Sequence, residues 1–225
     1  MIARITYAAR TLLSFLTFNV GWWACALGAS RGWPWLGPAL LPLWLGLRLY
    51  YTPMWKGEAL FFAALGFIGF AIDTALLHAG LFSVHSFLGV APLWLVAMWI
   101  LLGQTFESML MMRKNPWLIA LAGGLSGPFS YYCCEAVNIL HYARPLWLSL
   151  PAHALLWALL MPVLLRLRDF CMVAAIGVQA VRAAFPQVEP AFEPARVQVQ
   201  PEPLPPVHLV TTSAPDRRES VSLEH

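Results

Sequence analysis

Hydrophobic residues fall into six long runs, separated by short segments that are polar, basic or rich in proline. The most regular run, residues 58–80, is about 23 residues long, which as a helix is enough to cross the roughly 30 Å hydrocarbon core of a bilayer. The other five runs have similar lengths and lie at residues 11–30, 33–51, 88–111, 116–138 and 145–165. This pattern predicts an all-α, polytopic membrane protein with a bundle of six transmembrane helices.

Composition supports a membrane protein, because hydrophobic residues make up 60% of the chain and charged residues only 11%. Soluble domains usually carry about 25% charged residues. The formal net charge of +3 comes from basic residues at the ends of apolar runs, which sets topology rather than forming a nucleic-acid-binding patch. We therefore expect no nucleic-acid partner.

A cleavable signal peptide is an alternative for the first run, but Trp22 and Trp23 favour a retained helix.

The distribution of basic residues predicts the orientation, since loops on the cytoplasmic side are enriched in arginine and lysine. Only Arg31 and Arg144 fall on the opposite side if the six runs alternate in direction. The eight on the first side are Arg4, Arg10, Arg48, Lys56, Arg113, Lys114, Arg166 and Arg168. Both termini are accordingly predicted to be cytoplasmic.

Four segments follow from the same pattern. Residues 1–10 form a basic N-terminal lead, and residues 11–168 form the six-helix transmembrane domain. Residues 169–185 are predicted to extend the sixth helix or to lie on the membrane surface. Residues 186–225 are rich in proline and predict a disordered tail, whose final Leu223-Glu224-His225 is typical of the start of an expression tag.

Asp73 is the candidate around which a functional site can be built, because an ionisable group inside an apolar run is costly and is functional by default. Topology places it in the outer half of the third helix, on the side opposite to both termini. The catalytic candidates expected to converge there are Asp73, His78, Glu135 and His153, and the candidate ligand-binding residues are Asp73, Tyr131, Tyr132, Glu135 and Asn138. The alternative is a structural one, in which the acid is hydrogen-bonded between helices and the histidines pack at the interface. No spacing typical of a metal site is present, and the sequence indicates no particular cofactor.

Other polar positions favour structural roles. Glu107 is predicted to pair with Arg113 and Lys114 at the interface, while Asn19 is predicted to donate a hydrogen bond between helices. Gly123 and Gly127 form a GxxxG step that allows close helix packing, and a proline follows directly. Glycine followed by proline is typical either of a packing notch or of a discontinuous helix that lines a binding site, and both interpretations stay open.

Several stretches together resemble a family of uncharacterised bacterial inner-membrane proteins, domain of unknown function 2878. They are FNVGWWACALGA (18–29), PWLGP (34–38), the run with Asp73, APLW (91–94), GGLSGPFSYY (123–132) and ALLWALLMP (154–162). The chain departs from the expected family pattern near Cys134 and Asn138, where glycines would be expected. The resemblance implies a multi-helix protein of the bacterial inner membrane without an established activity. It also implies a genomic neighbourhood of enzymes that modify membrane fatty acids, such as methyltransferases like cyclopropane synthase.

These observations lead to three functional hypotheses. The first is an accessory inner-membrane protein that binds membrane lipid, with a lipid-modifying enzyme or another membrane protein as its partner. The second is a membrane-embedded hydrolase or transferase that uses Asp73 with His78 or His153 as acid and base. The third is a small transporter, although the sequence contains no internal repeat.

Overall fold

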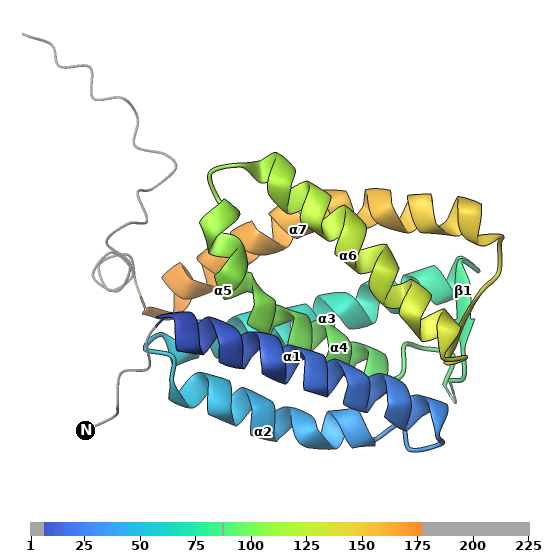
Figure 1. Cartoon of the computed structure of the whole chain (residues 1–225), viewed down its shortest axis with the longest axis horizontal. Coiled ribbons are helices and arrows are strands. Elements are labelled where there is room, and N and C mark those ends of the chain that lie inside the picture. The colour runs from blue at the N-terminus through green and yellow to red at the C-terminus, as the bar shows by residue number, and fades with distance from the viewer. Residues whose placement is uncertain (1–6, 87, 177–225) are drawn as a thin grey trace, which may run out of the picture. The chain divides into compact units, whose positions relative to one another are not determined.

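The computed structural model describes residues 7–86 and 88–176, and this part of the chain is mostly helical (Figure 1). The long helices are α1 (Tyr7–Ser30), α2 (Leu36–Tyr50), α3 (Trp55–His78), α4 (Leu93–Leu102), α6 (Pro116–Ala136) and α7 (Leu146–Ile176). After α4 the chain continues through the short turns η1 (Gly103–Thr105), α5 (Phe106–Met109) and η2 (Leu110–Met112). Two short strands complete the fold, β1 (Phe82–Val84) and β2 (Leu140–Tyr142).

Within the described residues, four helical segments are long and apolar enough to cross a membrane: Thr11–Ser30, Trp55–His78, Leu93–Met112 and Leu146–Ala175. They correspond to the first, third, fourth and sixth predicted spans. By contrast, α2 has only 15 residues, about 22 Å at the helical rise, and α6 contains several glycines and serines. The described residues thus support a mostly helical membrane architecture with four candidate spans, and the short sheet of β1 and β2 is an addition to the predicted all-α fold.

The fourth predicted span differs from the structure at its start. Its helix begins at Leu93 rather than at residue 88, because Pro92 is extended and Gly89 has a positive φ of 68°. Both conformations are incompatible with an α-helix. After α4 the 3₁₀ turns η1 and η2 wind the backbone more tightly than an α-helix does.

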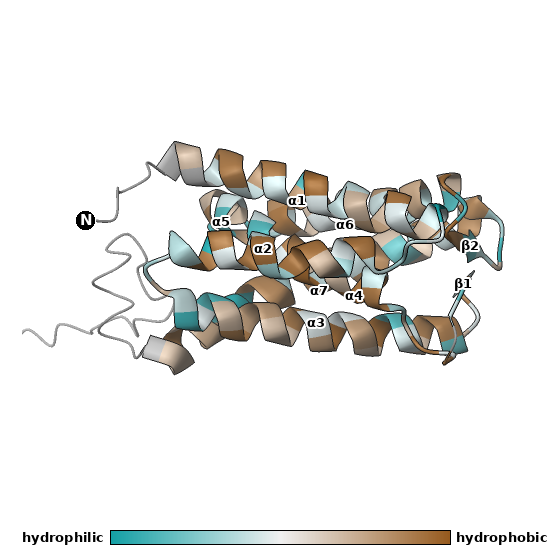
Figure 2. Ribbon diagram, turned by 90° about the horizontal axis from the view of Figure 1, so that it is seen from below, coloured by the Kyte–Doolittle hydropathy of each residue, from teal (hydrophilic) through white to brown (hydrophobic). Residues whose placement is uncertain are grey.

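The helices run back and forth along a common direction, so their connections gather at two ends (Figure 1). We call the end with residues 31–35, 79–92 and 137–145 the strand end, and the end with residues 51–54 and 113–115 the arginine end. At the strand end β1 pairs with β2 in antiparallel register, with Ser83 opposite His141. This pairing ties the α3–α4 connection to the α6–α7 connection. Figure 2 shows that hydrophilic residues concentrate toward the two ends and hydrophobic ones along the middle of the helices.

Close packing of α6 on α7 depends on the predicted glycine step. A Cβ atom added to Gly123 would lie 2.2 Å from Cγ of Met161, and one added to Gly127 would lie 2.1 Å from Cγ of Trp157. Both distances are far below a van der Waals contact, so only glycine fits. Helix α6 also continues without a break through Pro128. The packing-notch interpretation is therefore confirmed, and the discontinuous helix is wrong.

Helix α7 runs without interruption from Leu146 to Ile176 and includes Pro151 and Pro162. It extends beyond the predicted end of the sixth run at residue 165. The rest of the predicted extension, residues 177–185, and the proline-rich tail lie outside the described residues, so the predicted segment boundaries stay predictions.

Candidate functional site

Asp73 lies on the inner face of α3, in the half of the helix nearer the strand end, and its side chain is completely buried. Its two carboxylate oxygens each accept one hydrogen bond. The hydroxyl of Tyr131 on α6 donates to Oδ1 at 2.6 Å, and Nε1 of Trp99 on α4 donates to Oδ2 at 2.7 Å. The carboxylate therefore joins three helices, which satisfies a polar group that would otherwise be costly among apolar side chains.

His153 on α7 is also completely buried and lies against the same tyrosine. The ring centroids of His153 and Tyr131 are 4.4 Å apart. Its Nδ1 atom shares a hydrogen bond of 3.2 Å with the hydroxyl of Tyr142 in β2, whereas its Nε2 atom has no hydrogen-bond partner among the described residues. Tyr131 thus stands between the acid and the imidazole, and no hydrogen bond in the described part of the chain joins Asp73 to His153 directly.

Glu135 takes part at the edge of this group. It is half-buried at the end of α6, and its Oε2 accepts a hydrogen bond of 3.3 Å from the backbone N–H of Tyr142. Burial raises the pKa of the Tyr142 hydroxyl above its usual value, and the nearby Glu135 carboxylate raises it further. Tyr142 therefore stays protonated at neutral pH beside His153.

Three predicted site residues lie apart from this cluster. The His78 side chain is exposed at the last position of α3, and that of Tyr132 is exposed on the outer side of α6. Asn138 is exposed in the loop after α6, with a φ of 59°. The structure thus brings together Asp73, Tyr131, His153 and the neighbouring Glu135, and leaves the other three outside. The described residues contain no group of three or more histidine, cysteine, aspartate or glutamate side chains arranged to hold a metal ion.

A cavity of about 70 Å³ lies beside the Asp73 cluster, between α1, α4, α6 and α7. Trp99 and Tyr131, the two donors to Asp73, form part of its wall together with Trp157, whose ring stacks on that of Trp99 at 4.8 Å. Nε1 of Trp22 on α1 donates to Oγ of Ser130 on α6 at 2.8 Å, and both residues line the cavity. The sequence did not predict this cavity, although its α6 wall lies on one helical face, at residues 126, 127, 130, 131 and 134.

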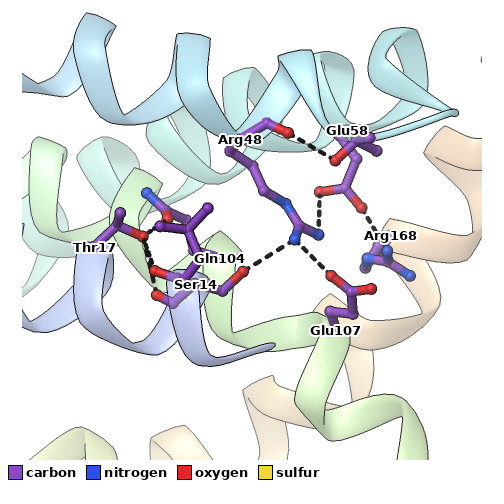
Figure 3. A network of polar contacts seen from close by, with 9 residues as sticks. Ser14, Thr17, Arg48, Glu58, Gln104, Glu107 and Arg168 are labelled. Carbon is purple, nitrogen blue, oxygen red and sulfur yellow. Dashed lines mark hydrogen bonds and ion pairs between the residues drawn. The ribbon is translucent and has the colours of Figure 1, made fainter. Parts of the chain in front are cut away.

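A second buried polar cluster, which we call the arginine network, lies near the arginine end (Figure 3). Arg48 on α2 forms ion pairs with Glu107 on α5 at 2.5 Å and with Glu58 on α3 at 3.4 Å, and Arg168 on α7 pairs with Glu58 at 2.5 Å. The side chains in these pairs are at most 7% exposed. Arg48 also donates to the hydroxyl of Ser14 on α1 at 3.0 Å, so the network connects five helical segments.

Two sequence predictions are corrected here. Glu107 pairs with the buried Arg48 rather than with Arg113 or Lys114 at the interface, because α5 turns it inward; Arg113 pairs instead with Asp169. Asn19 does not bridge helices, since its Nδ2 atom donates to the backbone oxygen of Phe15 one turn earlier in α1.

Comparison of the sequence with protein families gives a match to the family described as protein of unknown function (DUF2878), over residues 11–163. No curated protein and no solved structure matches the chain significantly. The matched region contains Asp73, the cavity and all members of the arginine network except Arg168.

Proposed function

This chain belongs to the DUF2878 family of proteins of unknown function, and we propose that it is an integral membrane protein that binds a lipid acyl chain in the cavity between α1, α4, α6 and α7. We place it in the bacterial inner membrane with six spans and both termini in the cytoplasm. The excess of basic residues on the side of the arginine end supports this orientation. In this arrangement α2 and α6 cross the membrane beside the four candidate spans named above.

The chemistry of the cavity carries the proposal. Its walls are mainly aromatic and aliphatic side chains, among them Trp22, Leu95, Trp99 and Trp157. Its volume of about 70 Å³ is about half that of an engineered apolar cavity of about 150 Å³ that binds benzene. The space suits a short stretch of hydrocarbon better than a polar substrate.

The position of the cavity favours a ligand that arrives from the bilayer. Helices α1 and α6 flank it, and both carry large exposed apolar side chains, such as Phe15 and Val20 on α1 and Leu125 and Phe129 on α6. The side-chain hydrogen bond from Trp22 to Ser130 links these two helices. An acyl chain lying along these two helices therefore reaches the cavity without crossing water.

Filling the cavity tests the proposal. Ser126 lines the cavity and is exposed on α6, so Ser126→Phe is expected to occupy the space while leaving the helix packing intact. The expected result is a severalfold decrease in lipid retained by the purified protein, measured by native mass spectrometry. Ala71→Phe on the exposed face of α3 is the matched control and is expected to retain lipid as the unchanged protein does. Equal retention by the Ser126→Phe and Ala71→Phe proteins would contradict acyl-chain binding at this cavity.

An accessory role beside a lipid-modifying enzyme extends the same proposal. The support is the cavity itself, since a protein that holds an acyl chain can present it to an enzyme in the same membrane. The proposed partner is a lipid-modifying enzyme or another membrane protein, as expected from the family resemblance.

A membrane-embedded hydrolase or transferase is the second candidate, and the unpaired Nε2 atom of buried His153 favours it. Both oxygens of Asp73 are already engaged by Tyr131 and Trp99, so any acid–base role falls to His153 with Tyr142. Incubation of the protein in phospholipid vesicles, followed by mass spectrometry of the lipids, tests this candidate. Enzymatic activity predicts new lipid products that disappear with His153→Gln, whereas unchanged lipids leave only the binding role.

A further inference from the structure

Two exposed basic side chains lie near each other at the arginine end, where α6 begins and α7 leaves the bundle. Lys114 lies in the connection before α6, and Arg166 lies on α7. Arg113 forms an ion pair with Asp169 and so joins these two segments. Lys114 directly follows Arg113 in the chain, and Arg166 precedes Asp169 by about one turn of α7. Lys114 and Arg166 therefore flank the same contact between the two segments.

The positive charge of these two side chains is not compensated by the described part of the chain. Neither Lys114 nor Arg166 forms an ion pair with another described residue. Among the described residues every aspartate and glutamate side chain is buried or half-buried, and the half-buried Asp169 is already paired with Arg113. An anion from outside the protein can therefore bind here without displacing an ion pair.

The position of Arg166 along α7 corresponds to the headgroup level of a bilayer. Helix α7 begins at Leu146, at the strand end, and Arg166 follows about 30 Å further along the helix. This length equals the thickness of the hydrocarbon core, about 30 Å. Trp117 at the start of α6 is 83% exposed, and exposed tryptophan rings typically lie at the same headgroup level.

An exposed apolar stripe runs along α7 from Arg166 toward the strand end. Leu155, Leu159 and Val163 are 63%, 66% and 57% exposed. Together with Arg166 they follow steps of four, four and three residues, so all four side chains lie on one face of the helix. The stripe extends about 16 Å from Arg166, close to the depth of one leaflet. A cation at one end of such a stripe fits a phospholipid better than a free anion from solution.

We propose that Lys114 and Arg166 bind the phosphate of an anionic phospholipid whose acyl chain lies along the exposed face of α7. Two uncompensated cations favour a headgroup with net negative charge, such as phosphatidylglycerol, over a zwitterionic headgroup whose ammonium group offsets its phosphate. The site lies on the surface of the bundle, and neither residue lines the cavity between α1, α4, α6 and α7. Its occupancy does not depend on a lipid in that cavity.

Competition between two lipids tests the site on the unchanged protein. Phosphatidylglycerol and phosphatidylcholine with identical acyl chains differ only in the headgroup, so binding of the chains contributes equally to both. Each basic residue near an anionic lipid surface increases affinity about fivefold. Native mass spectrometry after exchange into bicelles that contain equal amounts of the two lipids is therefore expected to show about twentyfold preference for phosphatidylglycerol. Equal retention of the two lipids would overturn the proposal.

Substitution of both cations assigns the preference to this surface. The double variant Lys114→Gln and Arg166→Gln is expected to retain the two lipids about equally. Arg31→Gln with Arg144→Gln is the matched control, because it removes the same charge from two exposed arginines at the strand end, and its preference should equal that of the unchanged protein. A preference that survives in the first variant, or that falls as far in the control, would contradict the assignment.

Ser126→Phe separates this proposal from the proposed function. Filling the cavity would lower the retention of both lipids by the same factor, since their acyl chains are identical, and should leave the ratio between them unchanged. Failure of acyl-chain binding in the cavity therefore appears in total retention, whereas failure of headgroup binding appears in the ratio.

Discussion

Glu58→Gln is expected to destabilise the protein by about 3–5 kcal/mol, the usual cost of removing one partner from a buried ion pair. Glu58 is the acid shared by Arg48 and Arg168, and its side chain is 2% exposed. Glutamine keeps the shape but leaves two buried guanidinium groups facing the single carboxylate of Glu107. The measurement is the free energy of unfolding in bicelles, followed by near-ultraviolet circular dichroism during a denaturant titration.

Asp169→Asn is the matched control for this prediction. It also removes an acid from an arginine pair, but Arg113 and Asp169 are 32% and 29% exposed, so solvent screens the loss and we expect a change of about 1 kcal/mol or less. Adding Arg168→Gln to Glu58→Gln restores the charge balance and should recover part of the lost stability. If the Glu58 variant is no less stable than the Asp169 variant, the network is hydrated rather than buried.

The arginine network also shows what a single sequence leaves undetermined. Each of its charged residues lies near the end of an apolar run, where basic residues ordinarily face the cytoplasm and acids ordinarily face water. Glu58 and Arg168 are 110 positions apart, and no local pattern links them. Their pairing follows from the way α3 packs on α7, which depends on tertiary contacts rather than on hydrophobic periodicity.

The cluster around Asp73 was predictable in part. Helix direction placed Tyr131 and His153 at the same end as Asp73, and the structure does bring these three together. Helix geometry explains why His78 lies elsewhere: five residues along an α-helix rotate a side chain by about 140°, so it leaves the face that carries Asp73. Adjacent residues differ by about 100°, which buries Tyr131 and exposes Tyr132.

Trp99 was missed because tryptophan in a membrane protein usually indicates the interface. Here the ring is 3% exposed and its N–H binds the carboxylate of Asp73. A Cβ added to Gly69 on α3 would lie 2.1 Å from Cγ of this indole. Gly69, one turn before Asp73, therefore makes room for the ring. In the sequence, a glycine four residues before a buried acid indicates that a bulky hydrogen-bond donor such as tryptophan packs against that face of the helix.

The second large effect is expected for Asp73→Asn. The carboxylate accepts from two donors, whereas an asparagine side chain has one carbonyl oxygen and must turn its NH₂ group toward either Tyr131 or Trp99. The NH₂ group is expected to turn toward Tyr131, whose hydroxyl oxygen can accept, because the indole of Trp99 can only donate. The hydroxyl hydrogen of Tyr131 then loses its buried acceptor, which should cost about 1–3 kcal/mol. The measurement is again the free energy of unfolding in bicelles.

A double-mutant cycle with Tyr131→Phe separates this hydrogen bond from other effects of the substitution. Phenylalanine keeps the ring that packs against His153 but removes the hydroxyl. In the Tyr131→Phe protein, Asp73→Asn therefore leaves no tyrosine O–H without an acceptor. The asparagine oxygen can still accept from Trp99, while its NH₂ group points toward the phenylalanine. We expect the second substitution to cost about 1 kcal/mol less in the Tyr131→Phe background than in the unchanged protein, a coupling typical of directly bonded side chains. Additive effects would mean that Tyr131 and Asp73 do not share a bond in the membrane. In that case the carboxylate would be free to act on a ligand, and the balance between a binding protein and an enzyme would shift toward chemistry at Asp73.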